Sequence, residues 1–111
     1  MLLETLKHNP EAIQFNDVIA YIDKQYTFTP TKFRNCDAIN NADENNGSCK
    51  IFSFAKLNNL SKDETLALFG DFYRKDVLEN PEANDHQNIR NFQKYGWDGI
   101  AFEGLALEKK S

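Results

Sequence analysis

Two polar segments hold most of the side chains in this chain that could do chemistry. Residues 40–50 contain the thiol of Cys49 among several asparagines, and residues 84–91 contain the imidazole of His86. A thiol near the start of a helix can have a lowered pKa, because the helix dipole stabilises the thiolate. A thiolate beside a histidine is the arrangement of a cysteine-nucleophile enzyme. Cys49 and His86 are therefore candidate catalytic residues if the fold brings them into contact.

The same two segments also indicate a polar binding pocket. Side-chain amides and the first N–H groups of a helix hydrogen-bond to small polar or anionic ligands. The candidate binding residues are Asn45, Ser48, Tyr73, Arg74, Asn88 and Arg90. A purely structural interpretation needs no ligand, since asparagines stabilise loops, arginines pair with acids and buried cysteines act as small hydrophobic residues. The pocket interpretation favours a small polar ligand or a protein partner, without a cofactor.

The composition argues against several classes of function. The formal net charge of the 111 residues is −4, and this balance lacks the excess of Lys and Arg needed to bind nucleic-acid phosphates. Cys36 and Cys49 form no CxxC or repeated Cys/His pattern, so no zinc site is expected. Asp43 and Glu44 lack the alternating acids of a calcium loop. We therefore expect neither nucleic-acid binding nor a bound metal.

The chain has the length of one domain and the polarity of a soluble one. A single domain over residues 1–111 is long enough to bury its own core. The longest apolar run, residues 18–22, is far too short to cross a membrane, and the N-terminus lacks a cleavable secretion signal. These features predict a cytoplasmic protein whose cysteines are free thiols.

The spacing of the apolar residues predicts helices on both sides of the polar segments. Helices are expected over residues 2–8, 17–26, 48–57 and 62–78, with another from residue 85 to Gly96. Asn16 or Asp17 would cap the second of these, and Asn84 or Asp85 would cap the last. Ser61 and Glu64 have the spacing of a capping box at the start of the helix over residues 62–78.

Alternating threonines and aromatic residues over residues 26–33 predict a strand. Pro30 lacks a backbone donor and should place this strand at a sheet edge or break it. Residues 34–37 are expected to form a hairpin turn, and residues 37–41 the returning strand. The sequence therefore predicts an antiparallel pair just before the first polar segment.

The predicted fold class is α+β and mainly helical, with about four helices and a small antiparallel sheet of two or three strands. An all-α domain with extended loops is the alternative. Ile100, Phe102 and Leu105 indicate a short closing strand. The charged residues 108–111 are expected to be frayed.

Four blocks of the chain form a pattern that covers nearly its whole length. They are Thr29-Pro30-Thr31-Lys32-Phe33, residues 45–55 beginning Asn45-Asn46-Gly47-Ser48-Cys49, residues 66–74 ending Phe72-Tyr73-Arg74, and His86-Gln87-Asn88-Ile89-Arg90-Asn91-Phe92 followed by Gly96-Trp97. Together these blocks resemble the HopJ-type family of small bacterial proteins. This chain departs from the family pattern at the hairpin turn, where the family usually has Asn-Gly and this chain has Asn35-Cys36.

The family name implies a type III secretion effector that is delivered into plant cells and meets a host protein there. Type III export signals tend to be Ser-rich and unstructured, whereas residues 1–8 are Leu-rich and predicted to be helical. The resemblance implies no enzymatic role for any residue. Our first hypothesis is a HopJ-like binding protein that acts through residues 41–50 and 84–91. The alternatives are a thiol enzyme using Cys49 and His86, and a translocated effector that binds a host protein.

Overall fold

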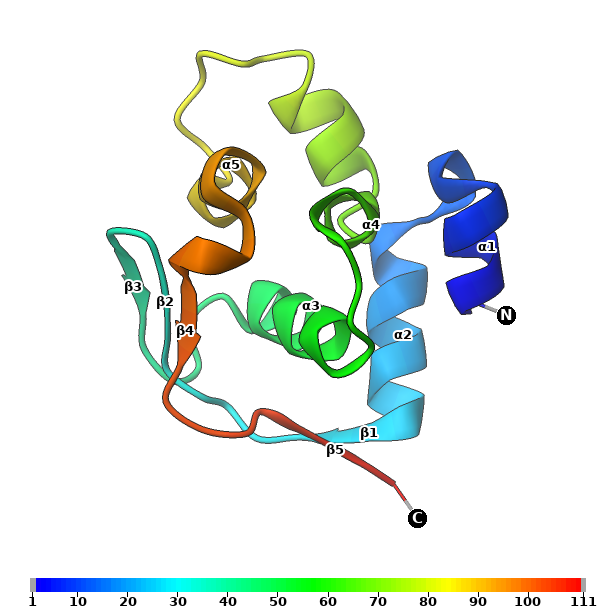
Figure 1. The fold of residues 1–111 in the computed structure, drawn as a ribbon, viewed down its shortest axis with the longest axis vertical. Coiled ribbons are helices and arrows are strands. Elements are labelled where there is room, and N and C mark those ends of the chain that lie inside the picture. The colour runs from blue at the N-terminus through cyan, green and yellow to red at the C-terminus, as the bar shows by residue number, and fades with distance from the viewer. Residues whose placement is uncertain (1, 111) are drawn as a thin grey trace.

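The computed structural model describes residues 2–110, which form helices packed with two small antiparallel sheets (Figure 1). The helices are α1 (Leu2–His8), η1 (Pro10–Ala12), α2 (Phe15–Gln25), α3 (Asn46–Leu57), α4 (Lys62–Ala67), η2 (Phe72–Val77), α5 (Gln87–Tyr95) and η3 (Gly96–Gly99). The strands are β1 (Tyr26–Phe28), β2 (Phe33–Asn35), β3 (Ala38–Asn40), β4 (Ile100–Phe102) and β5 (Leu107–Lys109). The mainly helical α+β class expected from the sequence is confirmed.

Helix α3 lies at the centre of the molecule, between α2 and the sheet that contains β2, β3 and β4 (Figure 1). It is buried on most of its circumference, as a helix surrounded by other elements should be. The ring of Phe52 on α3 lies with its centroid 5.0 Å from that of Phe92, 5.4 Å from that of Phe69 and 6.0 Å from that of Phe33. Aromatic packing therefore joins α3 to α5, to the turn after α4 and to the sheet.

The strand expected over residues 26–33 is broken, and its two parts belong to different sheets. β1 pairs with β5, whereas β2 lies between β3 and β4 in the order β3-β2-β4. The break falls around Pro30, which lacks the N–H group that a continuous ladder needs. The expected hairpin turn is present between β2 and β3, and Cys36 in that turn has a positive φ of 58°.

The helix expected over residues 62–78 starts as predicted but does not run through. Ser61 and Glu64 form the predicted capping box. However, α4 ends at Ala67, and a separate π-helix, η2, follows from Phe72. Gly70 between them has a φ of +60°, and a Cβ there would lie 2.8 Å from the backbone nitrogen of Phe15. The close approach of the start of α2 therefore forces the chain to leave the helical path at this glycine.

Three other helix starts differ from prediction. α2 begins at Phe15 with no side-chain cap, rather than at residue 17 under Asn16 or Asp17. α3 begins at Asn46, two residues before the expected start, and α5 follows His86 rather than a cap by Asn84 or Asp85. The expected stop of the last helix at Gly96 is confirmed by its positive φ of 64°.

The charged end of the chain is ordered over its described part, so the expected fraying is wrong for residues 108–110. β5 pairs with β1 through Leu107, Glu108 and Lys109, and the Lys110 N–H donates to the carbonyl of Gln25. The physical reason is the neighbouring Leu107, which is 1% exposed and fixes this strand in the core. Residue 111, included in the same expectation, lies outside the described residues.

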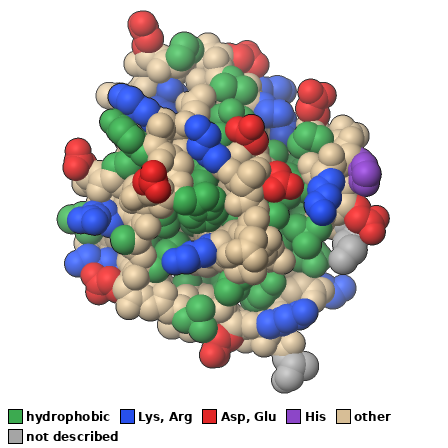
Figure 2. All heavy atoms as spheres, in the orientation of Figure 1, with side chains coloured by type: hydrophobic (Ala, Val, Ile, Leu, Met, Phe, Trp, Pro, Cys, Tyr) green, Lys and Arg blue, Asp and Glu red, His purple; other side chains and the backbone are tan. Residues whose placement is uncertain are grey.

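The surface carries charges of both signs side by side. Figure 2 shows Lys and Arg side chains interspersed with Asp and Glu over the face in view. Within residues 2–110, no helix has the length and apolarity needed to cross a membrane.

Candidate functional site

A hollow of about 520 Å³ lies where the first turns of α3 and α5 meet β3. We call it the main hollow. Its polar wall consists of Asn40, Asn45, Ser48, His86, Gln87 and Asn88. Its apolar wall consists of Phe15, Ala38, Ile39, Phe69, Phe72 and Ile89, with Gly47 completing the lining. Residues of both polar segments singled out in the sequence therefore line a single hollow.

The residues that immediately precede α3 and α5 are both in the left-handed conformation. Asn45 before α3 has a φ of 52°, and His86 before α5 has a φ of 50°. The left-handed region is unfavourable for residues other than glycine, although Asn and His are among the more frequent exceptions. Such conformations persist only where surrounding contacts hold them, and they cluster at functional sites. Both of these residues line the main hollow.

The first turns of α3 and α5 contain backbone donors that have no partner within their own helix. The first backbone bonds inside the helices run from the Cys49 N–H to the Asn45 carbonyl and from the Arg90 N–H to the His86 carbonyl, each 3.0 Å long. The three N–H groups before each of these donors consequently have no partner within their own helix. Neither Asn45 nor His86 supplies a side-chain cap. Each helix therefore presents uncapped donors at an end that lines the main hollow.

Asparagine side chains build much of the polar wall. Asn40 Oδ1 accepts hydrogen bonds from Asn45 Nδ2 at 2.6 Å and from Asn88 Nδ2 at 2.9 Å. Asn40 Nδ2 donates in return to Asn88 Oδ1 at 3.2 Å. Asn35 Nδ2 donates to the Asn88 carbonyl at 2.7 Å and to Asn88 Oδ1 at 3.2 Å. This asparagine network of Asn35, Asn40, Asn45 and Asn88 joins β2, β3, the start of α3 and α5.

Three of the four residues in the asparagine network are buried, and the fourth, Asn45, is exposed. Asn35 is fully buried, while Asn40 is 3% and Asn88 is 8% exposed. Buried polar groups that satisfy one another fix the elements that carry them, because each lost bond leaves a costly unpaired group. Asn35 Oδ1 is the exception, because it is buried without a hydrogen-bond partner among the described residues. The network thus holds the polar wall of the main hollow in place.

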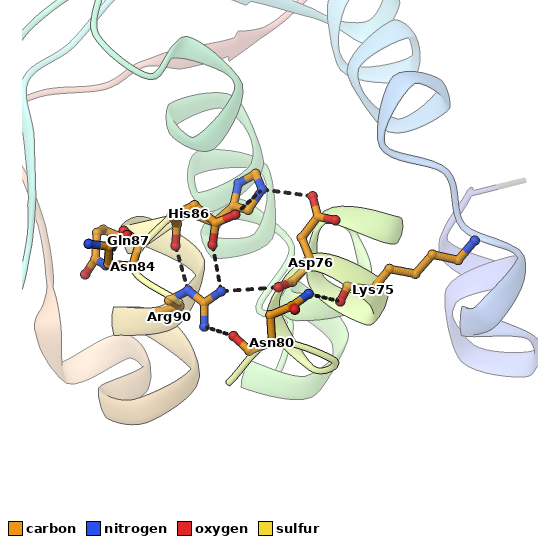
Figure 3. A network of polar contacts seen from close by, with 8 residues as sticks. Lys75, Asp76, Asn80, Asn84, His86, Gln87 and Arg90 are labelled. Carbon is orange, nitrogen blue, oxygen red and sulfur yellow. Dashed lines mark hydrogen bonds and ion pairs between the residues drawn. The ribbon is translucent and has the colours of Figure 1, made fainter. Parts of the chain in front are cut away.

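His86 is held from behind by carboxylates (Figure 3). Its Nε2 lies 3.0 Å from Oδ2 of Asp76 on η2 and 3.8 Å from Oδ2 of Asp85. Its ring centroid is 5.2 Å from that of Phe72, which also belongs to η2. These contacts join the start of α5 to the π-helix at one corner of the main hollow.

Arg90 is fully engaged away from the main hollow (Figure 3). It donates to the carbonyl of Asp85 at 2.6 Å, to Asp85 Oδ1 at 2.7 Å, to the carbonyl of Asn80 at 2.9 Å and to the carbonyl of Asp76 at 3.2 Å. The hydrogen bond from Arg90 is the main cause that lowers the pKa of Asp85. Arg90 therefore fastens the chain before α5 and does not contribute to the lining.

Arg74 and Tyr73, the other two predicted binding residues that do not face the main hollow, also lie outside its lining. Arg74 donates to the carbonyls of Ile13 at 2.6 Å and Pro10 at 3.2 Å, which joins η2 to the segment before α2. Tyr73 is half-buried against the core, and burial, followed by the charge of Asp63, raises the pKa of its hydroxyl. Among the predicted binding residues, Asn45, Ser48 and Asn88 line the main hollow, whereas Tyr73, Arg74 and Arg90 do not.

Cys49 does not have the environment of a nucleophile. Its side chain is 1% exposed, and its Sγ lies 3.6 Å from the carbonyl oxygen of Thr31. Burial raises the pKa of the Cys49 thiol, so the expected lowering by the helix start is wrong. The desolvation of the buried thiolate outweighs the hydrogen bonds with Thr31 and Ser53, which act to lower the pKa. Cys49 also lies outside the lining that contains His86, so the geometry lends the thiol-enzyme alternative no support.

Sequence reasoning missed several members of this site. Asn35 carried a usable signal, since it lies two residues after Phe33 on β2 and therefore shares its buried face. Phe72 and Asp76 fall within the predicted helix over residues 62–78, and Phe15 lies before the predicted helix over residues 17–26, so no sequence pattern marked them as site residues. No spacing links Asp76 to His86, because the contact depends on the break in the chain at Gly70. Within residues 2–110, no group of three or more His, Cys, Asp or Glu side chains is arranged to hold a metal ion.

Comparisons with known proteins agree on the family and fold. The family model described as HopJ type III effector protein matches residues 1–107. A crystal structure of a protein of unknown function, VPA0580, is similar with a TM-score of 0.97 and 56% sequence identity, and the match covers 98% of this chain and 91% of that one. No curated protein matches the chain. The resemblance inferred from the four sequence blocks is confirmed.

Proposed function

The chain belongs to the HopJ type III effector protein family, and we propose that it is a binding protein whose site is the main hollow. The observation that carries this proposal is the convergence of residues 45–48 and 86–89 on one hollow with a polar and an apolar wall. Two segments so far apart in sequence meet there because the asparagine network joins β3 to the starts of both helices.

The polar wall suits a neutral or singly charged group. Among the described residues, the lining includes no Lys or Arg. Positive potential therefore comes from the starts of α3 and α5, each equivalent to roughly half an elementary charge. The Ser48 hydroxyl, which has no hydrogen-bond partner among the described residues, adds a donor. A carboxamide, a carbonyl or a single carboxylate matches this wall better than a phosphate does.

The apolar wall calls for a second, apolar part of the ligand. Phe72 is 40% and Ile39 is 60% exposed, and both border the main hollow. Phe15 and Phe72 meet edge to face, with ring centroids 4.9 Å apart. Covering such exposed apolar side chains is favourable, at about 25 cal/mol per Å² removed from water. The proposed ligand class is thus an amide or carboxylate that carries an apolar group.

An NMR titration of the ¹⁵N-labelled full chain tests this proposal. The probes are phenylacetamide and phenylacetate, with inorganic phosphate as a third probe. We expect both aromatic probes to shift the amide signals of residues 45–48 and 86–89, and phosphate to shift them less. Shifts confined to other parts of the chain would contradict the proposal.

A matched pair of variants sharpens this titration. Ser48→Leu places a branched side chain on the wall of the main hollow and should abolish the shifts. Lys24→Leu adds the same side chain at an exposed position of α2 and should leave them unchanged. Equal binding by the two variants would remove the main hollow as the site.

Type III export is a second candidate function, favoured by the family description. The full chain fused to a C-terminal adenylate cyclase reporter would be expressed in a bacterium with an active type III system and in its secretion-defective mutant. Reporter activity in host cells that depends on the secretion system would support translocation and a host-protein partner. Retention in both strains would leave the bacterial cytoplasm as the place where the chain acts.

A further inference from the structure

β3 forms one edge of the three-stranded sheet. Its hydrogen-bonded neighbour is β2, with Phe33, Arg34 and Asn35 opposite Asn40, Ile39 and Ala38. Figure 1 shows β3 at the periphery of the sheet. A two-residue turn closes this hairpin, so the alternation of an antiparallel ladder directs the N–H and C=O groups of Ile39 away from β2. β3 therefore offers one outward donor and one outward acceptor.

A hollow lies on each face of the sheet at this edge. The main hollow is on the inner face, where Asn40 joins the asparagine network. A second hollow of about 260 Å³, the outer hollow, is lined by Lys32, Phe33, Arg34, Ile39, Ala101, Phe102 and Glu103. Ile39 is 60% exposed and belongs to both linings. The edge of β3 thus separates two hollows that one extended chain could reach.

We propose that β3 accepts an extended peptide segment of a partner protein as a fourth strand. The side chains of a strand point alternately to opposite faces of its sheet. On a strand added beside β3, one set of side chains would enter the main hollow and the other set the outer hollow. This inference rests on the proposed function, because it names the partner that fills the main hollow.

The two hollows call for different side chains on that peptide. The main hollow presents Phe15, Phe69 and Phe72, which suit an apolar or aromatic side chain. The outer hollow holds two cations, of which Lys32 is paired with Glu103 at 3.3 Å. Arg34 has no ion pair among the described residues. An acidic side chain of the peptide that points into the outer hollow would pair with Arg34. The preferred peptide therefore alternates apolar and acidic residues.

A second copy of this chain fits the edge less well than a peptide does. If β3 of another copy paired with β3, the inward side chains facing the main hollow would be its Ala38 and Asn40. Asn40 is held by Asn45 and Asn88 within its own chain and cannot extend into a neighbour. Self-pairing would therefore leave the apolar wall of the main hollow uncovered.

The test uses random octapeptides displayed as a library and selected on the full-length chain. Enriched peptides are synthesised, and their binding is measured by fluorescence anisotropy. The critical variant is Ile39→Pro, which removes the outward N–H group without removing a donor to β2. We expect it to weaken peptide binding by about tenfold or more, whereas Ile39→Val should stay within about twofold of the natural chain. Circular dichroism and the dispersion of the NMR spectrum check that both variants fold.

Reversing the charge of Arg34 and of its expected partners on the peptide provides a second test, because pairing of the strands alone would not respond to this reversal. Arg34→Glu should weaken binding of peptides with acidic residues at alternate positions, and replacing those residues by lysine should restore it. Enriched peptides without an alternating pattern, or binding that Ile39→Pro leaves intact, would overturn the inference. A concentration-dependent dimer lost in Ile39→Pro, with no enriched peptide, would assign the edge to a second copy and overturn it too.

The outcome is separable from that of the proposed function. Phenylacetamide and the enriched peptides are titrated separately into the natural chain, so each proposal is tested by its own probe. If phenylacetamide binds and no peptide is enriched, the strand inference fails while the main hollow remains a ligand site. If neither binds, both proposals fail.

Discussion

At the scale of single residues, neutral amides shape the main hollow more than charged side chains do. Each amide of Asn40 and Asn88 both donates and accepts, so one pair of side chains satisfies several buried groups. From the sequence, Asn45 and Asn88 could be chosen because they lie in polar segments next to helix starts. Asn40 falls in the predicted returning strand over residues 37–41, but its bonds to Asn88 could not be predicted because Asn88 lies far along the chain.

Replacing Asn40 by alanine should destabilise the fold by about 1–3 kcal/mol, since it leaves buried amide groups of Asn88 unpaired. Urea denaturation followed by circular dichroism measures the change in the free energy of unfolding. Asn41→Ala is the matched control, because Asn41 is exposed and its side chain makes no contact in the network. If Asn40→Ala lowers the free energy of unfolding no more than Asn41→Ala does, the asparagine network does not stabilise the fold.

The two cysteines should differ in reactivity. Burial raises the pKa of the Cys49 thiol, so less thiolate is present at neutral pH and iodoacetamide should label Cys49 slowly. Cys36 is half-buried in the hairpin turn and should be labelled first. Mass spectrometry of peptides from a labelling time course separates the two sites. Rapid labelling of Cys49 in the folded chain would revive the thiol-nucleophile alternative.

The raised pKa of Cys49 also makes the stability of the fold depend on pH. The pKa of the Cys49 thiol is higher in the folded chain than in the unfolded one. The contribution of this thiol to the free energy of unfolding is therefore complete below its unfolded pKa, roughly 8.5. That contribution is lost as the pH rises toward the folded value, because the unfolded chain then releases the proton more easily. Thermal unfolding between pH 7 and 10 should show a steeper alkaline loss for the natural chain than for Cys49→Ala. Parallel curves would contradict the burial effect.

At the scale of elements, local signals predicted helices well and their interruptions poorly. The periodic apolar residues of α2 and the capping box of α4 depend on neighbours in sequence, and both are present. The break at Gly70 depends on the start of α2, which lies more than fifty positions earlier. No local pattern could reveal that approach. The same break precedes η2, which carries Phe72 to the main hollow and Asp76 to His86.

Gly70→Ala should be strongly destabilising, at about 2–4 kcal/mol, for two reasons. The positive φ of 60° is unfavourable for alanine, and the new Cβ would lie 2.8 Å from the backbone nitrogen of Phe15. Gly104→Ala is the control, because the nearest contact of its Cβ is an ordinary 3.9 Å. Chemical denaturation compares the two, and similar stabilities would mean that the chain relaxes freely at Gly70.

At the scale of the whole molecule, the two sheets connect parts of the chain that are distant in sequence. β1 meets β5 at the C-terminal end, and β2 meets β4. The sequence predicted the hairpin of β2 and β3 because its turn is local. It could not predict which strands would accept β4 and β5, since three-residue strands leave little pattern to read. The charged residues 108–110 also hid the anchoring role of Leu107.

Leu107→Ala should cost about 2–5 kcal/mol, as expected for a leucine removed from a packed core. Leu105→Ala should change the stability by less than about 0.5 kcal/mol, because Leu105 is 60% exposed and Leu107 only 1%. Thermal and urea unfolding of this pair would test whether the C-terminal strand belongs to the cooperative unit. Equal effects at the two positions would show that β5 detaches before the core unfolds.

The asparagine network has a consequence for the environments in which the main hollow keeps its shape. Amide groups neither gain nor lose protons over the ordinary pH range, and salt does not screen their short hydrogen bonds as it screens ion pairs. A wall that depended on carboxylates and cations would deform as acidity or ionic strength changed. The part of the wall that Asn35, Asn40, Asn45 and Asn88 hold should instead keep the same contour across compartments that differ in both, whereas the corner at His86 depends on contacts with carboxylates.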